Sequence, residues 1–312
     1  MLLAVLLLVA GLVLLTVGAD RFVVASARLA RRLGISTVLI GALVVGLGTS
    51  APELLVSVLA AGRGEVDIAL GNVIGSNTAN MTLVLGSCAL VAPIVSRVRT
   101  IRREGFTMFI ALVFISLLLW NLRLDRWEAV LLAVGMVIAA LLLVWWSPSD
   151  REASQVDLIP GEDVWSGSMR REVIVGLATL AVTLVGADLL IRGAERLADE
   201  AGISSAFVGL VIVSVGTSLP ELATAIASAR RKETDLVIGN VLGSNLFNTL
   251  AVAGTAGLVG PGSVDAGFRY AMGFMLAAGF VAGVFVLTGR RLTRWEGAAL
   301  LAIFVGFVAM AV

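Results

Sequence analysis

The 312-residue chain has no histidine, a single cysteine and six prolines, and charged residues make up only 14% of it. Without histidine, most zinc hydrolases, histidine-based catalytic triads and histidine proton shuttles are excluded. One cysteine, Cys88, rules out a disulfide framework or a cysteine metal site within one chain. Soluble domains carry about 25% charged residues, so the low charge indicates a different class of protein.

Apolar residues make up 59% of the chain and fall into long runs. A bilayer-spanning helix needs about 20 apolar residues, and ten runs approach that length. The predicted spans are residues 2–20, 36–61, 68–92, 105–121, 127–146, 172–191, 205–229, 236–259, 268–288 and 295–312. A cleaved signal peptide over Met1–Val17 is the weaker interpretation, because a positive leading segment and a small-residue cleavage site are missing. The sequence therefore predicts an all-α transmembrane protein, with the lipid bilayer as its solvent.

The long polar connection 147–171 divides the predicted spans into two groups of five, so we expect two five-helix units, 1–146 and 172–312, and a cytoplasmic linker. Basic residues gather on one side of the spans, and such loops are cytoplasmic. That side holds 17 of the 23 Lys and Arg residues: Arg21, Arg28, Arg31, Arg32, Arg97, Arg99, Arg102, Arg103, Arg151, Arg170, Arg171, Arg230, Arg231, Lys232, Arg290, Arg291 and Arg294. Both termini are therefore expected outside. The net charge of +1 gives no overall attraction to nucleic acid.

The two groups repeat at a fixed offset of 168 residues. The matched pairs are Val17–Asp20 with Val185–Asp188, Gly34–Ser36 with Gly202–Ser204, Gly48–Glu53 with Gly216–Glu221, Gly71–Asn77 with Gly239–Asn245, and Arg126–Glu128 with Arg294–Glu296. Five spans is an odd number, so the second unit must enter the membrane from the opposite side. The sequence thus predicts ten helices in two inverted-topology repeats, an arrangement of secondary transporters that places the substrate between the repeats near the midplane.

Two prolines lie well inside predicted spans, and each is followed by a glutamate. Pro52 and Pro220 each remove a donor and disrupt the bond to the carbonyl four residues back, so we expect broken helices facing a polar cavity. Glu53 and Glu221 are carboxylates deep in the spans, which marks a functional site by default. Four other acids lie near span ends and are interpreted as interfacial anchors: Asp20, Asp188, Glu128 and Glu296.

Small polar residues flank both glutamates at helical spacing. The stripes are Thr49, Glu53 and Ser57; Thr217, Glu221, Thr224 and Ser228; Asn72, Ser76 and Asn80; and Asn240, Ser244 and Asn248. Such residues also join transmembrane helices without any ligand, which accounts for Asn72, Asn240, Ser57 and Ser228. Every oxygen-bearing group in the stripes suits hard cations such as Na⁺ and Ca²⁺ and none suits transition metals.

These paired motifs resemble those of the cation/Ca²⁺ exchanger superfamily, and the prokaryotic sodium/calcium exchanger branch in particular. Its two α-repeat motifs correspond here to residues 46–86 and 214–254. The resemblance implies ten helices, of which the first and sixth slide against the other eight. It also implies ion ligands in both halves: Glu53, Glu221, Thr49, Ser50, Thr217, Ser218, Ser76, Ser244, Asn80 and Asn248, with the backbone oxygens of Gly46 and Ser214.

The resemblance further implies electrogenic export of Ca²⁺ in exchange for Na⁺ across the plasma membrane, with no cofactor and no obligate protein partner. Some relatives have Asp where this chain has Asn248, which disfavours K⁺ co-transport here. Two carboxylates balance one Ca²⁺ or two Na⁺. Exchange of three Na⁺ for one Ca²⁺ would move one charge, and the membrane potential contributes about 2.3 kcal/mol per charge per 100 mV.

Three alternatives remain open at this point. A proton/calcium antiporter of the same superfamily would use the same two glutamates, but that branch typically has G-N-x-x-E around its acid. A cation channel is disfavoured by the inverted repeats and the compact polar site. An intramembrane enzyme is disfavoured because no nucleophile–base pair, H-E-x-x-H motif or Asp–Asp dyad lies in the spans.

Overall fold

The computed structural model describes residues 2–33, 37–95, 101–146, 168–200, 214–289 and 291–311. Helices dominate the described part of every predicted span. The first half comprises α1 (Leu2–Leu33), α2 (Thr37–Ile40), η1 (Gly41–Gly46), α3 (Leu47–Thr49), α4 (Ala51–Gly62), α5 (Val66–Ala79), η2 (Asn80–Val84), α6 (Leu85–Val91), η3 (Ile101–Gly105), α8 (Phe106–Leu118), η4 (Leu119–Asn121) and α9 (Arg126–Trp146). The second half comprises α10 (Met169–Glu200), α12 (Ser214–Thr217), α13 (Leu219–Arg230), α14 (Thr234–Leu246), η7 (Phe247–Val252), α15 (Ala253–Val259), α16 (Phe268–Gly289) and α17 (Arg294–Ala311).

Six of the described helical segments are long and apolar enough to cross a membrane, or seven if the bent pair 41–49 and 51–62 is one span. The predicted boundaries 2–20 and 172–191 end too early, because α1 and α10 continue to Leu33 and Glu200. Their apolar runs stop, but the helices go on as charged, amphipathic extensions. Of the predicted linker, residues 169–171 are helical, and 147–167 lie outside the described residues.

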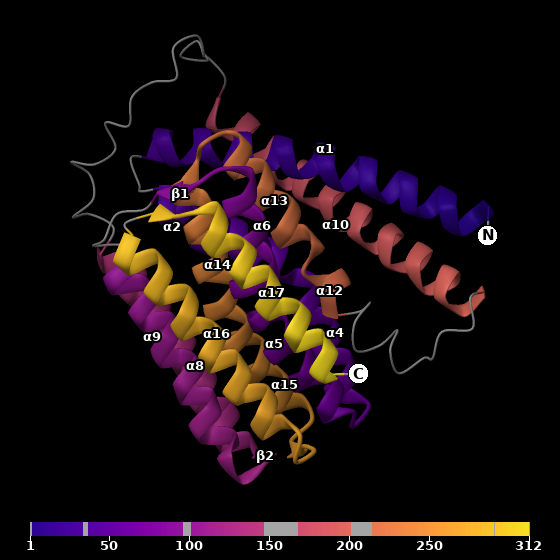
Figure 1. Ribbon diagram of the computed structural model, residues 1–312, viewed down its shortest axis with the longest axis vertical. Coiled ribbons are helices and arrows are strands. Elements are labelled where there is room, and N and C mark those ends of the chain that lie inside the picture. The colour runs from indigo at the N-terminus through magenta and orange to yellow at the C-terminus, as the bar shows by residue number, and fades with distance from the viewer. Residues whose placement is uncertain are drawn as a thin grey trace.

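The long helices α1 and α10 lie side by side across one face of the molecule, and the remaining helices form a bundle beside them (Figure 1). Their crossing uses two repeat-mate glycines. A Cβ on Gly186 would meet the backbone nitrogen of Leu15, and one on Gly18 would lie 2.7 Å from Thr183 Oγ1. Glycine therefore permits close contact between the two backbones at matching positions of both halves.

The bundle has its apolar core among α5, α8, α14 and α16. Leu70, Leu112 and Ile115 are fully buried there. Large apolar side chains on the outer helices are instead exposed, among them Val137 on α9 and Phe280 on α16. Apolar exposure over whole helices is what lipid-facing surfaces require.

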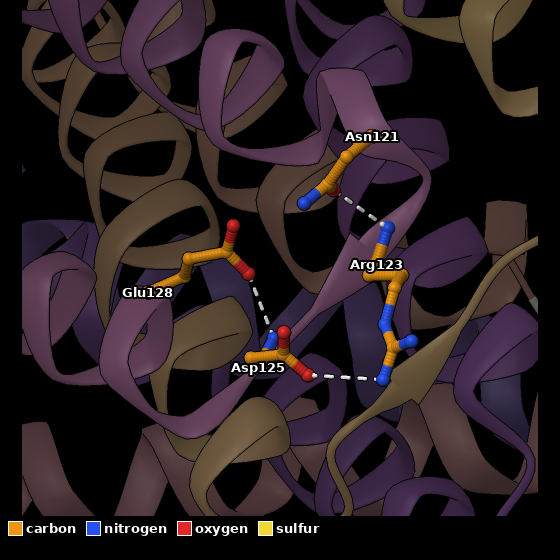
Figure 2. A network of polar contacts seen from close by, with 4 residues as sticks. All are labelled: Asn121, Arg123, Asp125 and Glu128. Carbon is orange, nitrogen blue, oxygen red and sulfur yellow. Dashed lines mark hydrogen bonds and ion pairs between the residues drawn. The ribbon is translucent and has the colours of Figure 1, made fainter.

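Two short ribbons join loops of the two halves at opposite ends of α8. Strand β1 (Ile94–Val95) pairs antiparallel with β4 (Arg291–Leu292), and β2 (Arg123–Leu124) pairs with β3 (Gly262–Ser263). Near β2, Glu128 Oε2 accepts a hydrogen bond from the Asp125 backbone N–H at 2.7 Å, and Asn121 Oδ1 accepts one from Arg123 N–H (Figure 2). These contacts order the start of α9.

The repeat mates Glu128 and Glu296 accept equivalent hydrogen bonds at the starts of α9 and α17. Glu296 Oε2 accepts bonds from the N–H and the hydroxyl of Thr293, as Glu128 accepts one from Asp125 N–H. Both glutamates, interpreted from sequence as interfacial anchors, therefore act as helix caps at the membrane-end turns.

The α4–α5 and α13–α14 hairpins also have matching turns. Gly64 (φ 80°) and Lys232 (φ 59°) both adopt the left-handed conformation, 168 residues apart. The same backbone bonds close both turns: Glu65 N donates to Ala60 O, and Glu233 N donates to Ser228 O. The sequence repeat is thus also a repeat of backbone structure in these hairpins.

Candidate functional site

Both proline-containing helices are interrupted, as the sequence predicts. Ser50 (φ −83°, ψ 13°) separates α3 from α4, and Ser218 (φ −85°, ψ 4°) separates α12 from α13. The segments on either side of Ser50 are bent by 49°. Pro52 and Pro220 stand at the start of the following helices, where a missing N–H breaks no helical bond. The breaks set the next acidic residues in the first turns of α4 and α13.

Those acids are Glu53 and Glu221, which are 0% and 1% exposed. Each is bonded by the serine at the break of the other half: Ser50 Oγ donates to Glu221 Oε1 at 2.6 Å, and Ser218 Oγ donates to Glu53 Oε1 at 3.3 Å. The broken helices therefore meet crosswise, and both acids face the junction between the halves.

The second carboxylate oxygens, Glu53 Oε2 and Glu221 Oε2, are buried and have no hydrogen-bond donor within the described ranges. Buried polar atoms are normally satisfied, and a buried carboxylate is stable as an ion only when it is paired or coordinates a cation. Two such oxygens beside one junction are a chemically suitable pair of ligands for a hard cation.

Asn72 and Asn240 tie the two halves together behind the acids. Asn72 Nδ2 donates to the Glu53 carbonyl at 3.1 Å, while its Oδ1 accepts a bond from Thr217 Oγ1 at 3.1 Å. Asn240 repeats this with the Glu221 carbonyl at 3.1 Å and Thr49 Oγ1 at 3.4 Å. Each asparagine thus fixes the backbone of one glutamate and the break of the opposite half.

This role was missed by the sequence interpretation, which took Asn72 and Asn240 as general contacts between helices. Their side chains also bond Ser57 Oγ at 3.1 Å and Thr224 Oγ1 at 3.2 Å. The signal available in the sequence was the exact repetition of Gly-Asn-Val in both halves. An asparagine at the same position of both halves, one turn before the predicted ligand serine, is consistent with this shared role.

The serines one turn further along differ in their contacts. Ser244 Oγ donates to the Gly46 carbonyl at 3.2 Å and lies 3.4 Å from Glu221 Oε1. Ser76 Oγ is buried, and no described residue bonds it. Ser244 and the Gly46 carbonyl are therefore at the same junction as Glu221, whereas the side chain of Ser76, at the repeat-mate position, is not bonded by any residue in the described ranges.

Asn80 and Asn248 lie one further turn along, beside wide helical turns. The π-helical segment η2 begins at Asn80, and η7 spans Phe247–Val252 around Asn248. Both side chains are 0% exposed, and neither amide oxygen nor nitrogen of either residue has a hydrogen-bond partner in the described part of the chain. Single π-turns often occur at functional sites. Two uncommitted buried amides at repeat-mate positions provide two further oxygens for a cation.

Small residues bring η1 against α14 at this level. A Cβ on Gly41 would lie 3.0 Å from the Gly239 Cα, and one on Gly46 would lie 2.9 Å from Ser244 N. Ala42 packs directly on Gly243. The close approach carries the Gly46 carbonyl to Ser244, so larger side chains at these positions would separate the two halves of the site.

Of the residues predicted from the sequence, the structure brings Glu53, Glu221, Ser50 and Ser218 into direct side-chain contacts across the halves, and Ser244 bonds the backbone carbonyl of Gly46 in the other half. Thr49 and Thr217 each bond an asparagine of the other half, while Ser76, Asn80 and Asn248 are buried and their side chains have no bonding partner among the residues that the structure describes. Ser214 begins α12, which lies against α5, but its side chain is outside the described residues. Over the described ranges, no three His, Cys, Asp or Glu side chains are grouped so that they could hold a metal ion together. The donors available at the junction are therefore two carboxylates and neutral oxygens.

The profile of the family described as sodium/calcium exchanger protein matches residues 3–145 and 172–312. A putative antiporter, CaxA, of Alkalimonas amylolytica is 38% identical over 98% of both chains. The inner membrane protein YrbG of Escherichia coli is 36% identical over 85% of this chain and 82% of its own.

Among solved structures, the sodium-calcium exchanger NCX_Mj superimposes with a TM-score of 0.85 at 28% identity, covering 99% of this chain and 98% of the other. The family profile spans nearly the whole chain and includes both broken helices. Members of this family are ion exchangers, so the fold and the paired motifs have a common explanation: the chain belongs to the sodium/calcium exchanger family, within the cation/Ca²⁺ exchanger superfamily.

Proposed function

We propose that this chain exchanges Na⁺ for Ca²⁺ by alternating access, exporting Ca²⁺ electrogenically. The observation that carries the proposal is the crosswise pair of contacts, Ser50 to Glu221 and Ser218 to Glu53. These contacts place the acid of each half at the helix break of the other. A cation held between the acids is therefore bound by both halves, and it is exposed to one side or the other as α1 and α10 slide against the remaining helices.

The proposed ligands are those expected from the sequence: both carboxylates, the hydroxyls of Thr49, Ser50, Thr217, Ser218, Ser76 and Ser244, the amides of Asn80 and Asn248, and the backbone oxygens of Gly46 and Ser214. They are neutral or anionic oxygens, and flexible oxygen sets suit Ca²⁺ better than the strictly octahedral Mg²⁺. Two negative charges offset one Ca²⁺ or two Na⁺. The carriers share ligands, so binding of one ion excludes the other.

The proposed topology is ten helices in two inverted repeats, 1–146 and 172–312, joined by a cytoplasmic linker, with both termini outside. It is supported by the 168-residue offset, by the matching hairpin turns at Gly64 and Lys232, and by the concentration of Arg and Lys on one side. The same bias, together with an inner-membrane relative, supports a plasma-membrane location.

Reconstituted vesicles test the cargo and the coupling ion. A Na⁺ gradient, at clamped pH and without K⁺, is expected to drive uptake of radioactive Ca²⁺, and a negative potential on the Ca²⁺ side should alter the rate. Uptake driven by a pH gradient in Na⁺-free buffer would instead identify a proton/calcium antiporter. Ca²⁺ flux that needs no counter-ion and does not saturate would identify a channel.

A further inference from the structure

An ion pair joins α1 to the turn that follows α13. Arg231 Nε donates to Asp20 Oδ1 at 2.9 Å and Arg231 Nη2 donates to Asp20 Oδ2 at 2.8 Å. Both side chains are partly buried, at 35% and 42% exposure. This two-point geometry is the strong form of an arginine–carboxylate contact. It links one of the two long crossing helices to the bundle that contains the acids.

The repeat mates of this pair, Asp188 and Arg63, are not joined. Asp188 Oδ2 accepts a bond from Arg192 Nε at 2.7 Å, one turn along its own helix α10. Arg63 is exposed and has no ion-pair partner among the described side chains. The turns around Arg63 and Arg231 have the same backbone form, with left-handed residues immediately after each arginine. The difference therefore lies in where α1 and α10 sit, rather than in the turns.

Apolar packing differs at the same two places. Ala227 and Leu236 are 7% and 0% exposed, and they pack with Val23 of α1. Their repeat mates, Leu59 and Ile68, are 51% and 52% exposed. One hairpin end is thus covered by α1, whereas the equivalent surface of the other hairpin is uncovered.

The two hairpin ends lie at opposite ends of the bundle. Thr234 Oγ1 donates to the carbonyl of Val95 in β1, and Asp265 N, beside β3, donates to Asp67 Oδ1. Strand β1 precedes α8 in the chain. Strand β2, which pairs with β3, follows α8, so the two ribbons stand one membrane-spanning helix apart (Figure 1).

We propose that Asp20–Arg231 and Asp188–Arg63 are alternative contacts of the transport cycle, which position α1 and α10 and are formed one at a time. In the conformation described, the first pair holds the Arg231 end closed while the Arg63 end is uncovered. In the opposite conformation Asp188 leaves Arg192 for Arg63, α10 covers Leu59 and Ile68, and Asp20 separates from Arg231. The proposal rests on alternating access as the mode of transport, because two inverted repeats can exchange conformations.

Cysteine labelling at two repeat-mate positions tests this. In a background with Cys88→Ala, Ala227→Cys reports on the Arg231 end and Leu59→Cys on the Arg63 end, using a charged maleimide on sealed vesicles of each orientation. Arg231→Gln is expected to raise labelling of Ala227→Cys by about two- to fivefold and to lower that of Leu59→Cys, as the loss of one partly exposed ion pair permits. Arg63→Gln should shift both reporters in the opposite sense.

Two controls separate a positioning role from a general structural one. Arg123→Gln removes an exposed ion pair within the β2 turn and should leave both reporters unchanged. The double exchange Asp20→Arg with Arg231→Asp should restore the original labelling ratio. The proposal is overturned if Arg231→Gln and Arg63→Gln shift the reporters in the same direction, if either behaves like Arg123→Gln, or if Leu59→Cys is inert from both sides.

The labelling needs no ion gradient, so its outcome is independent of the cargo. Opposite shifts in a chain that fails to exchange Na⁺ for Ca²⁺ would keep the paired contacts and refute the proposed function. Na⁺/Ca²⁺ exchange without those shifts would keep the function and refute the paired contacts.

Discussion

The two halves of the molecule agree closely at the junction and differ toward the ends. At the junction, the Asn72 bonds to the Glu53 carbonyl and to Thr217 have counterparts, at the same offset, in the bonds of Asn240. One turn away the match fails. Asn77 Nδ2 bonds Thr249 Oγ1 of the other half at 2.8 Å, whereas its mate Asn245 bonds the carbonyl of Val241 in its own helix.

The mismatch has a simple cause in the sequence. The position equivalent to Thr249 is Met81, which has no hydroxyl to offer Asn245. The hydroxyl that each bridging asparagine bonds also differs. Asn72 bonds Ser57, whereas Asn240 bonds Thr224, which lies one residue before the position equivalent to Ser57. The comparison teaches that the bonds between each helix break and the acid and asparagine of the other half are retained in both directions, whereas the bonds around them follow local differences in sequence.

The largest effect is expected from substitution of the two glutamates at the symmetric junction. Glu53→Gln and Glu221→Gln should each lower Na⁺-driven Ca²⁺ uptake by roughly 30-fold or more, since loss of one partner of a buried charge pair costs about 2–5 kcal/mol. The two losses should be similar because both acids occupy equivalent positions. Uptake is measured per amount of inserted protein, and a native rate in either variant would refute the site.

Removal of the bridging amides should have the next largest effect. Asn72→Ala and Asn240→Ala each lose two hydrogen bonds, one with a threonine hydroxyl of the other half and one with a glutamate carbonyl, at a cost of about 0.5–1.5 kcal/mol for each bond. We expect the apparent Ca²⁺ affinity to fall by roughly 5- to 150-fold, as measured by competition with radioactive Ca²⁺. Asn121→Ala, in the exposed turn of Figure 2, is the matched control and should bind normally.

Enlarging the glycines at the α1–α10 crossing should destabilise the protein. Gly186→Ala and Gly18→Ala would place a methyl group against the backbone of Leu15 and of Thr183, respectively, and overpacking costs about 1–3 kcal/mol. Gly273→Ala, at a position with no neighbouring atom within 4 Å, is the control. Thermal unfolding in detergent should show a lower midpoint for the first two variants only; an unchanged midpoint would argue against the close crossing.

The smallest effect is expected from substitution of Asn77 and Asn245, the repeat mates whose bonds differ. Asn77→Ala loses a bond between the halves, whereas Asn245→Ala loses one within its own helix. We expect Asn77→Ala to be the more destabilising by about 1 kcal/mol, because it takes the amide donor from the buried Thr249 hydroxyl, whereas the Val241 carbonyl lies within a helix that supplies a backbone donor. Thermal unfolding of the two variants side by side provides the measurement, and a larger loss for Asn245→Ala would reverse the interpretation.

Much of the fold was predictable from sequence because lipid imposes a simple rule on apolar runs. The helices, the repeat and the breaks before Pro52 and Pro220 follow from hydropathy, spacing and proline geometry. The ends of α1 and α10 were not predictable in this way, since their helices continue beyond the apolar run. Whether a polar segment after a span stays helical depends on its tertiary neighbours, which here include Arg231 bonding Asp20.

The site was predictable in composition but not in connectivity. Motif repetition identified both acids and their flanking hydroxyls, because buried carboxylates are rare in membranes. It did not reveal that each serine bonds the acid of the other half, since that depends on how the halves dock. The π-turns next to Asn80 and Asn248 were also invisible, because no side-chain pattern distinguishes them from ordinary helix.

Lys232 has a bearing on how the second half is held in the bilayer. It holds a left-handed backbone conformation that its mate Gly64 adopts without strain, at a cost of about 1–2 kcal/mol for a residue with a side chain. Around it, Arg230-Arg231-Lys232 stands where the first half has Gly62-Arg63-Gly64. In the proposed inverted topology these two turns face opposite sides of the membrane, so the added positive charge would help to hold the second turn on the cytoplasmic side, even at the cost of an unfavourable backbone geometry.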